Sequence, residues 1–292
     1  MRLKKLTNDQ LEEVQGGFRE GRDCADQLFV LQQSLCSRAA VGKVTYAAFV
    51  DLSKAFDTVW RDGFLHKLWN SGVQGKIWRI IRAFYQSTES CVMVGNKKTD
   101  WFVGDVGVRQ GAVTSPLIFS IFVNDLVNEI RKVGGGIQVC VKLISILLFA
   151  DDIVLLADTK EELQQMLTVL HKFTEKWRLR VNNKKTKVIV FDPSRKANDL
   201  EGLFLYNNVR VEVVNKYKYL GVVLKYDLKW TENIEYVIGK GMRRSNSIIS
   251  ILRFKGLSTE AKLCVWKALV HPILEYGSQT WWPNKTQSMR YN

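Results

Sequence analysis

Two adjacent carboxylates, Asp151 and Asp152, lie between two apolar runs in the segment Ile146–Ala157. Each run has the length and β-branched content of a buried strand, so the segment predicts a β-hairpin with Asp-Asp at its turn. Two carboxylates about 4 Å apart repel each other by about 4 kcal/mol at an effective dielectric of about 20. A cation is therefore expected beside them, and a divalent metal is the obvious candidate. The alternative is a plain β-turn that uses aspartate twice.

A third carboxylate, Asp51, ends the strand-like run Val44–Asp51. A carboxylate at the end of a buried strand is costly unless it has a partner. If Asp51 met the Asp-Asp turn, the three acids could hold two Mg²⁺ ions, which activate an attacking 3′-oxygen and stabilise a leaving pyrophosphate. The alternative role for Asp51 is to cap the next segment, and we expect Asp57 to be structural.

Two glycine-containing segments are weaker candidates for binding phosphate. In Arg109–Pro116, Gly111 permits close backbone approach, and Ser115 is predicted to be the N-cap of a helix with Pro116 in its first turn. The free N–H groups of such a helix start attract anions. In Gly17–Asp23, two arginines flank a glycine and could hold a triphosphate or template phosphate. The alternatives are an ordinary loop-to-helix junction and a solvated loop.

The chain is basic, and its charge is unevenly distributed. Of the net charge of +14, residues 1–158 contribute little, with 19 Lys and Arg against 17 Asp and Glu, whereas residues 159–292 carry 24 against 12. A basic half beside an acidic centre suits a protein that holds a polyanion, and nine Trp and nine Tyr offer stacking surfaces. The alternative is a generally basic, solvated surface.

The remaining pattern predicts alternating helices and strands, hence an α+β sheet covered by helices on one face. Helices are expected near Asp62–Asn70 and Lys76–Tyr85, from Ser115 and from Thr159, with a hairpin around Gly95-Asn96 and strands over Val188–Phe191, Val209–Val214 and Tyr217–Leu224. No apolar run reaches the length of a membrane span, and no secretion signal follows Met1. Five scattered cysteines without a Cys-x-x-Cys pair support neither a zinc site nor a disulfide framework, which fits an intracellular setting.

The order of these motifs resembles that of reverse transcriptases, most closely those of non-LTR (LINE-like) retrotransposons. A strand Asp is followed by Arg-Gln-Gly with Ser-Pro, by Phe-Ala-Asp-Asp, by Asn-x-x-Lys-Thr-Lys and by Tyr-Leu-Gly. Asn182, Lys185, Thr186 and Lys187 match the fourth motif, and the segment Lys267–Gly277 resembles the region after the start of the thumb in such elements. The resemblance extends from about residue 16 to 283.

This resemblance implies a right-hand polymerase fold of the α+β class, in which an antiparallel palm sheet is backed by helices. Residues 1–43 would be partial fingers, 44–192 the palm with some fingers elements, 193–224 the end of the palm with the primer grip, and 225–292 a partial thumb. The implied activity is RNA-directed DNA polymerisation, the transfer of dNTPs onto a primer 3′-OH with two Mg²⁺ ions or Mn²⁺. Implied partners are an RNA template, a DNA primer, their RNA–DNA hybrid and dNTPs, with no membrane, in the nucleus and cytoplasm.

The resemblance also assigns roles to individual residues. Asp51, Asp151 and Asp152 would be the palm carboxylates, with the Leu52 carbonyl helping to hold one metal. Phe56 would be the bulky gate that rejects a ribose 2′-OH, or else a core phenylalanine. The further assignments are Gln110, Gly111 and Arg22 to the nucleotide site, Lys185 or its competitor Lys187 to protonating pyrophosphate, and Tyr219, Leu220 and Gly221 to the primer grip.

The chain also departs from the family pattern. Only about fifteen residues precede Gly17, where the family has further finger strands, and no endonuclease or Cys/His segment is present. The chain is therefore expected to be part of a longer polyprotein with an endonuclease. A catalytically inactive nucleic-acid-binding remnant and a group II intron-type reverse transcriptase are the alternatives, although Pro272–Tyr276 argues against the latter.

Overall fold

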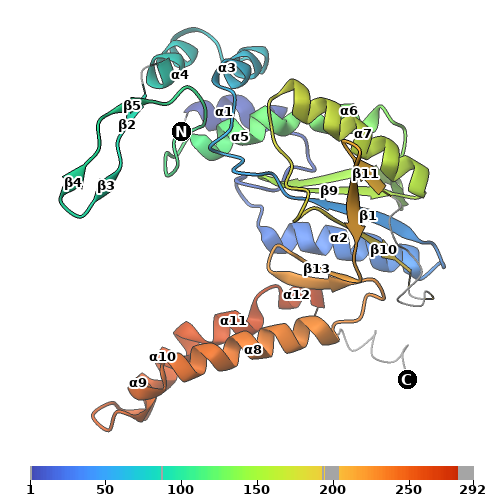
Figure 1. The fold of residues 1–292 in the computed structure, drawn as a ribbon. Helices are drawn as coiled ribbons and strands as arrows, with labels where there is room; N and C mark the ends of the chain where they lie inside the picture. The colour runs from blue at the N-terminus through green and yellow to red at the C-terminus, as the bar shows by residue number, and fades with distance from the viewer. Residues whose placement is uncertain (1, 87, 193, 195–203, 282–292) are drawn as a thin grey trace.

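The computed structural model describes residues 2–86, 88–192, 194 and 204–281 (Figure 1). At its centre is a six-stranded sheet that contains the apolar strands expected from the sequence. In sheet order the strands are β11 (Phe204–Tyr206), β12 (Val209–Val213), β10 (Lys187–Phe191), β1 (Thr45–Val50), β9 (Asp152–Ala157) and β8 (Ile146–Phe149). All neighbours are antiparallel except β10 and β12.

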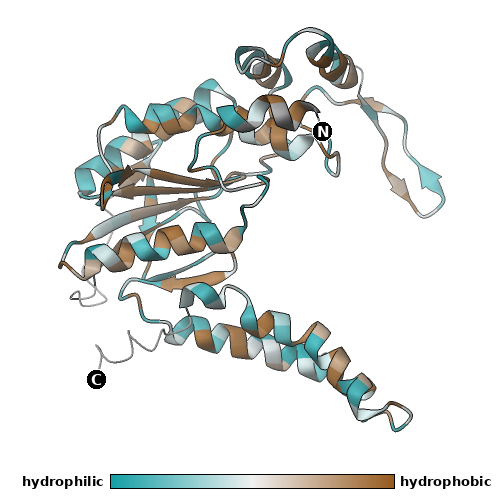
Figure 2. Ribbon diagram, turned by 180° about the vertical axis from the view of Figure 1, so that it is seen from behind, coloured by the Kyte–Doolittle hydropathy of each residue, from teal (hydrophilic) through white to brown (hydrophobic). Residues whose placement is uncertain are grey.

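Strand β1 is buried on both faces, and its side chains alternate between two hydrophobic clusters. Ala48 and Val50 pack into one cluster, whereas Ala47 and Phe49 pack into the other. The central strands are accordingly the most uniformly apolar part of the ribbon in Figure 2. A sheet that buries apolar side chains on both faces needs a covering layer on each side.

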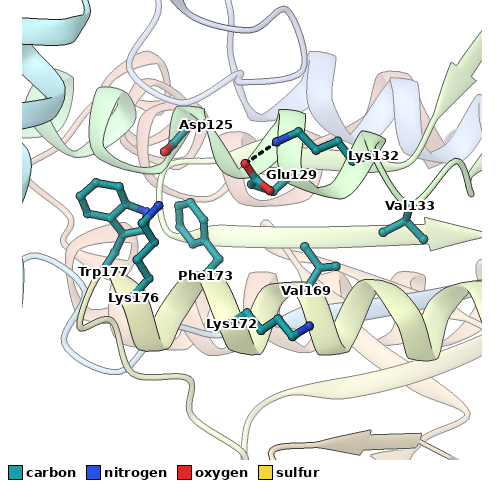
Figure 3. Close-up of a pocket in the computed structure, with 9 residues that line it drawn as sticks. All are labelled: Asp125, Glu129, Lys132, Val133, Val169, Lys172, Phe173, Lys176 and Trp177. Carbon is teal, nitrogen blue, oxygen red and sulfur yellow. Dashed lines mark hydrogen bonds and ion pairs between the residues drawn. The ribbon is translucent and has the colours of Figure 1, made fainter.

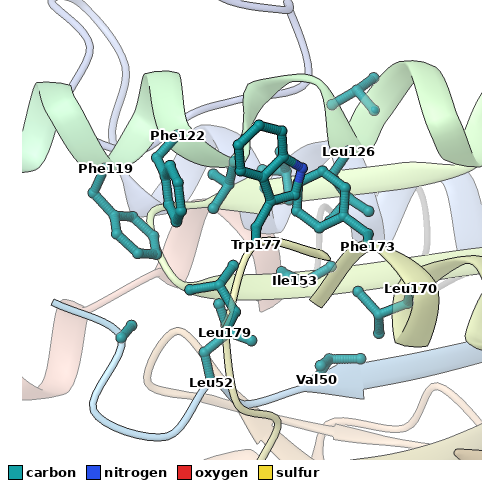
Figure 4. Packing of buried hydrophobic residues seen from close by; sticks show 14 of the residues in the cluster. Val50, Leu52, Phe119, Phe122, Leu126, Ile153, Leu170, Phe173, Trp177 and Leu179 are labelled. Atoms are coloured by element: carbon teal, nitrogen blue, oxygen red, sulfur yellow. The ribbon is translucent and has the colours of Figure 1, made fainter. Parts of the chain in front are cut away.

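The larger cluster lies beneath four helices, α3 (Arg61–Asn70), α5 (Ser115–Asn124), α6 (Leu126–Arg131) and α7 (Lys160–Lys176). The sequence predicted α3 with nearly the observed bounds and the starts of α5 and α7, whereas the helix expected from Ser115 is divided into α5 and α6. Figure 4 shows Phe122, Phe173 and Trp177 packed over the sheet residues Val50 and Ile153. This layer anchors the ends of β1 and β9 from which the acids project.

The opposite face is covered by α2 (Cys24–Ala39) and by a small hairpin, β13 (Lys216–Tyr219) and β14 (Val222–Lys225). The expectation that helices cover one face only is therefore wrong. The amphipathic pattern of α2 was not resolved in the sequence, although Asp23 and Asp26 form a reciprocal capping box at its start. The expected single strand over Tyr217–Leu224 is also wrong, because Leu220 and Gly221 form the turn of the hairpin.

Two parts of the chain project from the sheet and its layers (Figure 1). Near the N-terminal side, α4 (Gly75–Gln86) leads into a long ribbon, in which β2 (Glu89–Ser90) pairs with β5 (Phe102–Val103) and β3 (Met93–Val94) with β4 (Lys97–Lys98). Gly95-Asn96 forms the tip of the ribbon, as expected. At the other end, the helices α8 (Thr231–Ser247), α9 (Ile249–Arg253), α10 (Thr259–Leu269) and α11 (His271–Glu275) form an elongated arm that α12 (Ser278–Trp281) connects back to α2.

The remaining elements are short. They are α1 (Arg2–Thr7), a 3-10 turn η1 (Asn8–Gln10), and the hairpin β6 (Ile137–Val139) and β7 (Lys142–Ile144). Ser115 is not the N-cap of α5 as expected, because Thr114 occupies that position and Ser115 donates its hydroxyl hydrogen bond to the Arg109 carbonyl over 2.6 Å. Among the described residues, no helix combines the length and the apolar character needed to cross a bilayer. The expected domain boundary at residue 193 and the tail 282–292 lie outside the described residues.

Candidate active site

The Asp-Asp pair lies at the turn between β8 and β9, as the sequence predicted. Ala150, the residue before the pair, has φ of +57°, a left-handed conformation that alanine rarely adopts. Two backbone N–H groups, those of Ala150 and Gly17, donate to the buried Gln15 side-chain oxygen over 3.2 and 3.0 Å. The Gln15–Gly17 segment therefore holds the turn in place from the edge of the sheet, where Gly16 also donates to the Leu148 carbonyl over 2.8 Å.

The third acid, Asp51, follows the last residue of β1. Val50 pairs with Ile153 in the antiparallel ladder, which places Asp51 beside the Asp-Asp turn. Burial raises the pKa of Asp152 to about 6, and the negative charges of Asp151 and Asp51 add to this effect. Burial, with a smaller contribution from Asp51, also raises the pKa of Asp151. The three carboxylates thus form one interacting group, as the sequence led us to expect.

A lysine lies over this acidic group. The Lys185 Nζ stands 3.6 Å from Asp51 Oδ1, and its charge lowers the pKa values of Asp151 and Asp152. The Asn182 side-chain oxygen accepts from the backbone N–H groups of Lys184 and Lys185, while the Asn182 N–H donates to the Asp51 carbonyl over 2.8 Å. Asn182 therefore forms an Asx turn that docks Lys185 on the end of β1.

The competing residue Lys187 has a different environment. Its ammonium donates to the Glu212 carboxylate over 2.6 Å and to the Lys184 carbonyl. It lies within β10 opposite Phe49, two residues before Asp51. Of Lys185 and Lys187, only Lys185 lines the surface pocket beside Asp51 and Asp151.

Asp51, Asp151 and Lys185 open onto one surface pocket of about 490 Å³. Its other lining residues come from the segment after β1 and from two loops: Leu52, Ser53, Lys54, Ala55, Phe56, Asp57, Gln110 and Asn182. Phe56 forms part of the floor and stacks on the buried Phe119 with ring centroids 4.8 Å apart. The pocket thus combines three acids, two lysines and one aromatic residue.

The loop before α5 reaches the rim of this pocket. The Gln110 side-chain nitrogen donates to the Asp57 carboxylate over 2.6 Å, so Asp57 positions a pocket residue. The backbone N–H of Val108 donates to the Phe56 carbonyl over 2.8 Å, which ties the loop to the floor residue. Gly111 has φ of +82° and open space around its Cα, which explains the glycine and leaves room for a ligand.

Six of the expected site residues do not line the pocket: Asp152 and Gly111, which lie next to it, and Arg22, Tyr219, Leu220 and Gly221, which lie elsewhere. Tyr219, Leu220 and Gly221 belong to the β13–β14 hairpin on the opposite face of the sheet. Burial raises the pKa of Tyr219, and the negative charge of Asp152 raises it further. Arg22 donates to the Glu13 carbonyl and lies 3.9 Å from the Glu13 carboxylate. Asp152 therefore faces the hairpin, whereas Asp151 faces the pocket.

The donor set fits a hard divalent cation, because it consists of carboxylate oxygens and backbone carbonyls. Burial, with the negative charges of neighbouring acids adding to it, raises the pKa values of Asp151 and Asp152, and a bound cation would offset both effects. In the part of the chain that the structure describes, no three acidic, His or Cys side chains surround a single point. A bound ion would therefore have to draw the carboxylates together.

The supporting roles of three residues were not predictable from the sequence. Gln15 is a lone glutamine in an irregular segment and had no sequence signal. Tyr276 belongs to the recognised segment Lys267–Gly277, but nothing in that segment indicated its hydrogen bond to the Leu220 carbonyl. Asn182 belonged to the Asn-x-x-Lys-Thr-Lys motif, and asparagine in a short polar segment is typical of an Asx turn.

A second pocket, shown in Figure 3, lies between α6 and α7. Its volume is about 390 Å³, and Asp125, Glu129, Lys172 and Lys176 are among its lining residues. It does not include any of the three carboxylates at the sheet end. The chemistry expected from the sequence is therefore assigned to the pocket beside Asp51.

A comparison with protein families identifies the family of this chain. The family described as "Reverse transcriptase (RNA-dependent DNA polymerase)" matches residues 1–224. The chain belongs to the reverse transcriptase family. Members of this family generally depend on divalent metal, which agrees with the acidic pocket.

Curated relatives of this reverse transcriptase chain come from mobile elements, which confirms the resemblance to non-LTR retrotransposons. The chain is 27% identical over 290 residues to the probable RNA-directed DNA polymerase from transposon BS of Drosophila melanogaster, and 27% identical over 284 residues to that from mobile element jockey of Drosophila funebris. Each alignment covers 93% of this chain and 30% of the relative. The Pol polyprotein of the type-1 retrotransposable element R2 of Nasonia vitripennis is 29% identical to this chain, and the alignment covers 62% of this chain and 18% of that relative. The chain thus spans between about a fifth and a third of the length of these relatives.

Solved structures show the same fold. Telomerase from Candida tropicalis in complex with a fragment of telomeric RNA aligns over 96% of this reverse transcriptase chain and 45% of that chain, with a TM-score of 0.59 and 14% identity. Apo telomerase from the same organism aligns over 99% and 52%, with a TM-score of 0.57 and 13% identity. The right-hand polymerase fold with a mostly antiparallel central sheet is therefore confirmed.

Proposed function

We propose that this chain is the polymerase core of a non-LTR retrotransposon protein that extends a DNA primer 3′-OH on an RNA template with dNTPs. The observation that carries the proposal is the single pocket onto which Asp51, Asp151 and Lys185 open. Membership of the reverse transcriptase family supports the reaction class. The names of the relatives support the mobile-element setting.

In this proposal the central sheet is the palm, residues 44–192, and the β13–β14 hairpin ends the palm at residue 224. Residues 1–43 belong to the fingers and the helical arm from residue 225 belongs to the thumb. Asp51, Asp151, Asp152 and the Leu52 carbonyl would hold two Mg²⁺ ions, or Mn²⁺. Bound there, such ions lower the pKa of the attacking hydroxyl and stabilise the charge on the departing pyrophosphate.

The side chains of the pocket would then handle the nucleotide. Phe56 lies beside Asp57 on the floor, where a bulky ring would meet a ribose 2′-OH, so the pocket would favour dNTPs. Gln110 and Gly111 would contact the nascent pair, and Lys185 would give a proton to the leaving pyrophosphate. Arg22 is paired with Glu13 in this structure, so binding of a triphosphate by Arg22 would require it to leave that partner.

The partners follow from this chemistry. The substrate would be an RNA–DNA hybrid, held by the basic second half of the chain. The Tyr219–Gly221 hairpin turn would support the primer end. Because the relatives are about three times longer and some are named Pol polyproteins, the chain would act as part of a longer polyprotein with an endonuclease, in the cytoplasm and nucleus.

Primer extension tests the proposal directly. The chain is incubated with a primed RNA template, dNTPs and Mg²⁺, and extension is compared among the wild type, Asp151→Ala and the exposed hairpin variant Asp100→Ala. We expect metal-dependent extension by the wild type and Asp100→Ala, and none by Asp151→Ala. Hybrid binding without extension by any of the three proteins would instead identify a catalytically inactive nucleic-acid-binding remnant.

A further inference from the structure

The hairpin turn assigned to the primer grip is conformationally strained. Tyr219 pairs with Val222, so Leu220 and Gly221 alone connect β13 to β14. Their φ angles are +43° and +83°, both in the left-handed region. Glycine adopts this region freely, whereas a leucine meets a steric penalty there and stays only where its surroundings hold it.

The residue that holds Leu220 comes from the C-terminal part of the chain. The Tyr276 hydroxyl donates a hydrogen bond of 2.9 Å to the Leu220 carbonyl. The same ring covers Gly221, since a Cβ atom on Gly221 would lie 2.7 Å from Tyr276 Cε1. Tyr276 therefore contacts both residues of the turn, and the glycine is required for close approach as well as for its φ angle.

Tyr276 is itself fixed in place. Its backbone carbonyl accepts a hydrogen bond of 2.9 Å from the Trp281 indole, and Trp281 is buried in the cluster beneath β13 and β14. Gly277 has φ of +66°, and a Cβ atom there would lie 3.0 Å from a methyl group of Val222. Partial burial, followed by the nearby Cys24 thiol, raises the pKa of Tyr276 to about 12, so its hydroxyl stays a donor at neutral pH.

The other side of the hairpin rests on the strand that leads to Asp51. Phe49 stacks on Tyr217 with ring centroids 4.7 Å apart, and its ring lies 5.5 Å from that of Tyr219. The hairpin is thus held from two sides. Phe49 of β1, two residues before Asp51, contacts it on one side, and Tyr276 contacts its turn on the other. This sandwich links the position of the turn to the position of the carboxylates.

We propose that Tyr276 is a positioning residue that holds the Leu220-Gly221 turn where the primer 3′ end must be seated. The proposal rests on the proposed function, because it assigns the turn to primer binding. Loss of the Tyr276 hydroxyl should weaken engagement of the primer end while leaving nucleotide binding in the pocket beside Asp51 unchanged. The contact acts through the hairpin, since Tyr276 does not line the pocket.

Tyr276→Phe tests the hydroxyl and preserves the ring. A single lost hydrogen bond predicts a rise of about five-fold in KM for primed template, with KM for dNTP and kcat at saturating primed template changed by less than about two-fold. Hydrogen exchange should also become faster in the peptide spanning residues 216–225, because the turn opens more often. The matched control is Tyr206→Phe, which removes a hydroxyl hydrogen bond to Thr174 at the far edge of the sheet.

The two readouts separate this inference from the proposed function. If wild-type extension is absent but Tyr276→Phe still accelerates exchange in the hairpin, the polymerase assignment fails and the contact stands. Equal hairpin exchange in Tyr276→Phe and wild type, or a KM for primed template no higher than that of Tyr206→Phe, would overturn the positioning role. An equal rise in KM for dNTP would also overturn it, because the effect would then reach the pocket as a whole.

Discussion

The backbone of Gly17 lies directly against that of Ala150, so that a Cβ atom on Gly17 would stand 2.3 Å from the Ala150 nitrogen. Ala150 precedes the Asp-Asp pair and has a left-handed φ angle. An alanine at position 17 must therefore push the Asp-Asp turn or the Gln15–Gly17 segment out of place. The packing of the N-terminal segment is thus coupled to the position of Asp151.

Gly17→Ala should reduce primer extension by at least about ten-fold and destabilise the chain by about 1–3 kcal/mol through overpacking. Extension is measured well below the melting temperature of the variant, so that the loss reports the site rather than unfolding. Gly104→Ala is the control, because the nearest atoms to its added Cβ lie at 3.8 and 3.9 Å. Wild-type extension by Gly17→Ala would show that the turn tolerates the shift.

Asp152→Asn should make the metal-free chain more stable and the polymerase inactive. The pKa of Asp152 is raised to about 6 in the folded chain from 3.8, so the folded state holds its proton at higher pH than the unfolded state. The free energy of unfolding therefore falls as pH rises from about 4 to 6, and the full electrostatic cost is present at neutral pH. Asparagine removes that cost.

Thermal denaturation in EDTA at about pH 7.5 and at about pH 4 measures this effect. The increase in melting temperature for Asp152→Asn over wild type should be larger at the higher pH, and Asp100→Asn should show no such difference. Mg²⁺ should stabilise the wild type more than Asp152→Asn. An equal increase at both pH values would contradict the assigned cause.

Lys185→Ala should slow extension far more than Lys187→Ala does. Lys185 stands 3.6 Å from Asp51 in the pocket, whereas Lys187 is held by Glu212. Loss of a general acid typically costs about 10²-fold or more in rate. Single-turnover extension with saturating dNTP separates this loss from weaker binding, and comparable rates for the two variants would remove Lys185 from the chemistry.

The sequence was sufficient to predict the strands that carry the three acids, because local patterns encode them. Apolar runs predicted the strand that ends at Asp51 and the hairpin that turns at Asp151-Asp152, and the sheet places the second strand of that hairpin, β9, beside β1. The antiparallel order that joins β1 to β9 is not encoded locally, and it entered through the resemblance to a family. The sequence motif also left two candidates for the pocket lysine, Lys185 and Lys187. The folded chain separates them, because the Asx turn of Asn182 places Lys185 beside Asp51.

The contacts that hold the site were not predictable for a different reason. Gln15 and Leu148 are 133 residues apart and Tyr276 and Leu220 are 56 apart, so a hydrogen bond between such segments leaves no periodic trace. Helix α2 was missed because its buried positions include Gln27, Gln32, Ser34 and Arg38, which weaken the apolar stripe. Tertiary contacts of polar side chains of this kind appear only once the chain is folded.

Phe56→Ala should let the pocket accept NTPs. The Phe56 ring stacks on Phe119 and lines the pocket beside Asp51, so removing it leaves space for a 2′-OH. The ratio of kcat/KM for dNTP over NTP should fall by at least about ten-fold, within the range that one steric contact provides. Phe56→Tyr keeps the bulk and should preserve discrimination. Unchanged discrimination in Phe56→Ala would assign Phe56 to the core alone.

Lys67→Met should flatten the pH dependence of stability in the alkaline range. The Lys67 ammonium is buried, 3.7 Å above the Trp177 ring and 4.6 Å from that of Phe173, and it pairs with Asp125 (Figure 4 shows both rings). Burial lowers its pKa from 10.5 to about 8, although Asp125 opposes this. At neutral pH this difference between the pKa values of the unfolded and folded chain corresponds to a loss of about 3 kcal/mol in the free energy of unfolding.

The sign follows from proton binding. Between about pH 8 and 10.5 the unfolded chain holds more protons on Lys67 than the folded chain does, so the free energy of unfolding rises with pH across that range. Denaturant titrations at about pH 7.5 and 10 should therefore show a smaller upward change for Lys67→Met than for wild type. Lys132→Met is the control, since Lys132 is 69% exposed. Because all three proteins share the same titrating tyrosines and cysteines, a slope in Lys67→Met equal to that of wild type would mean that Lys67 keeps its proton in the folded chain.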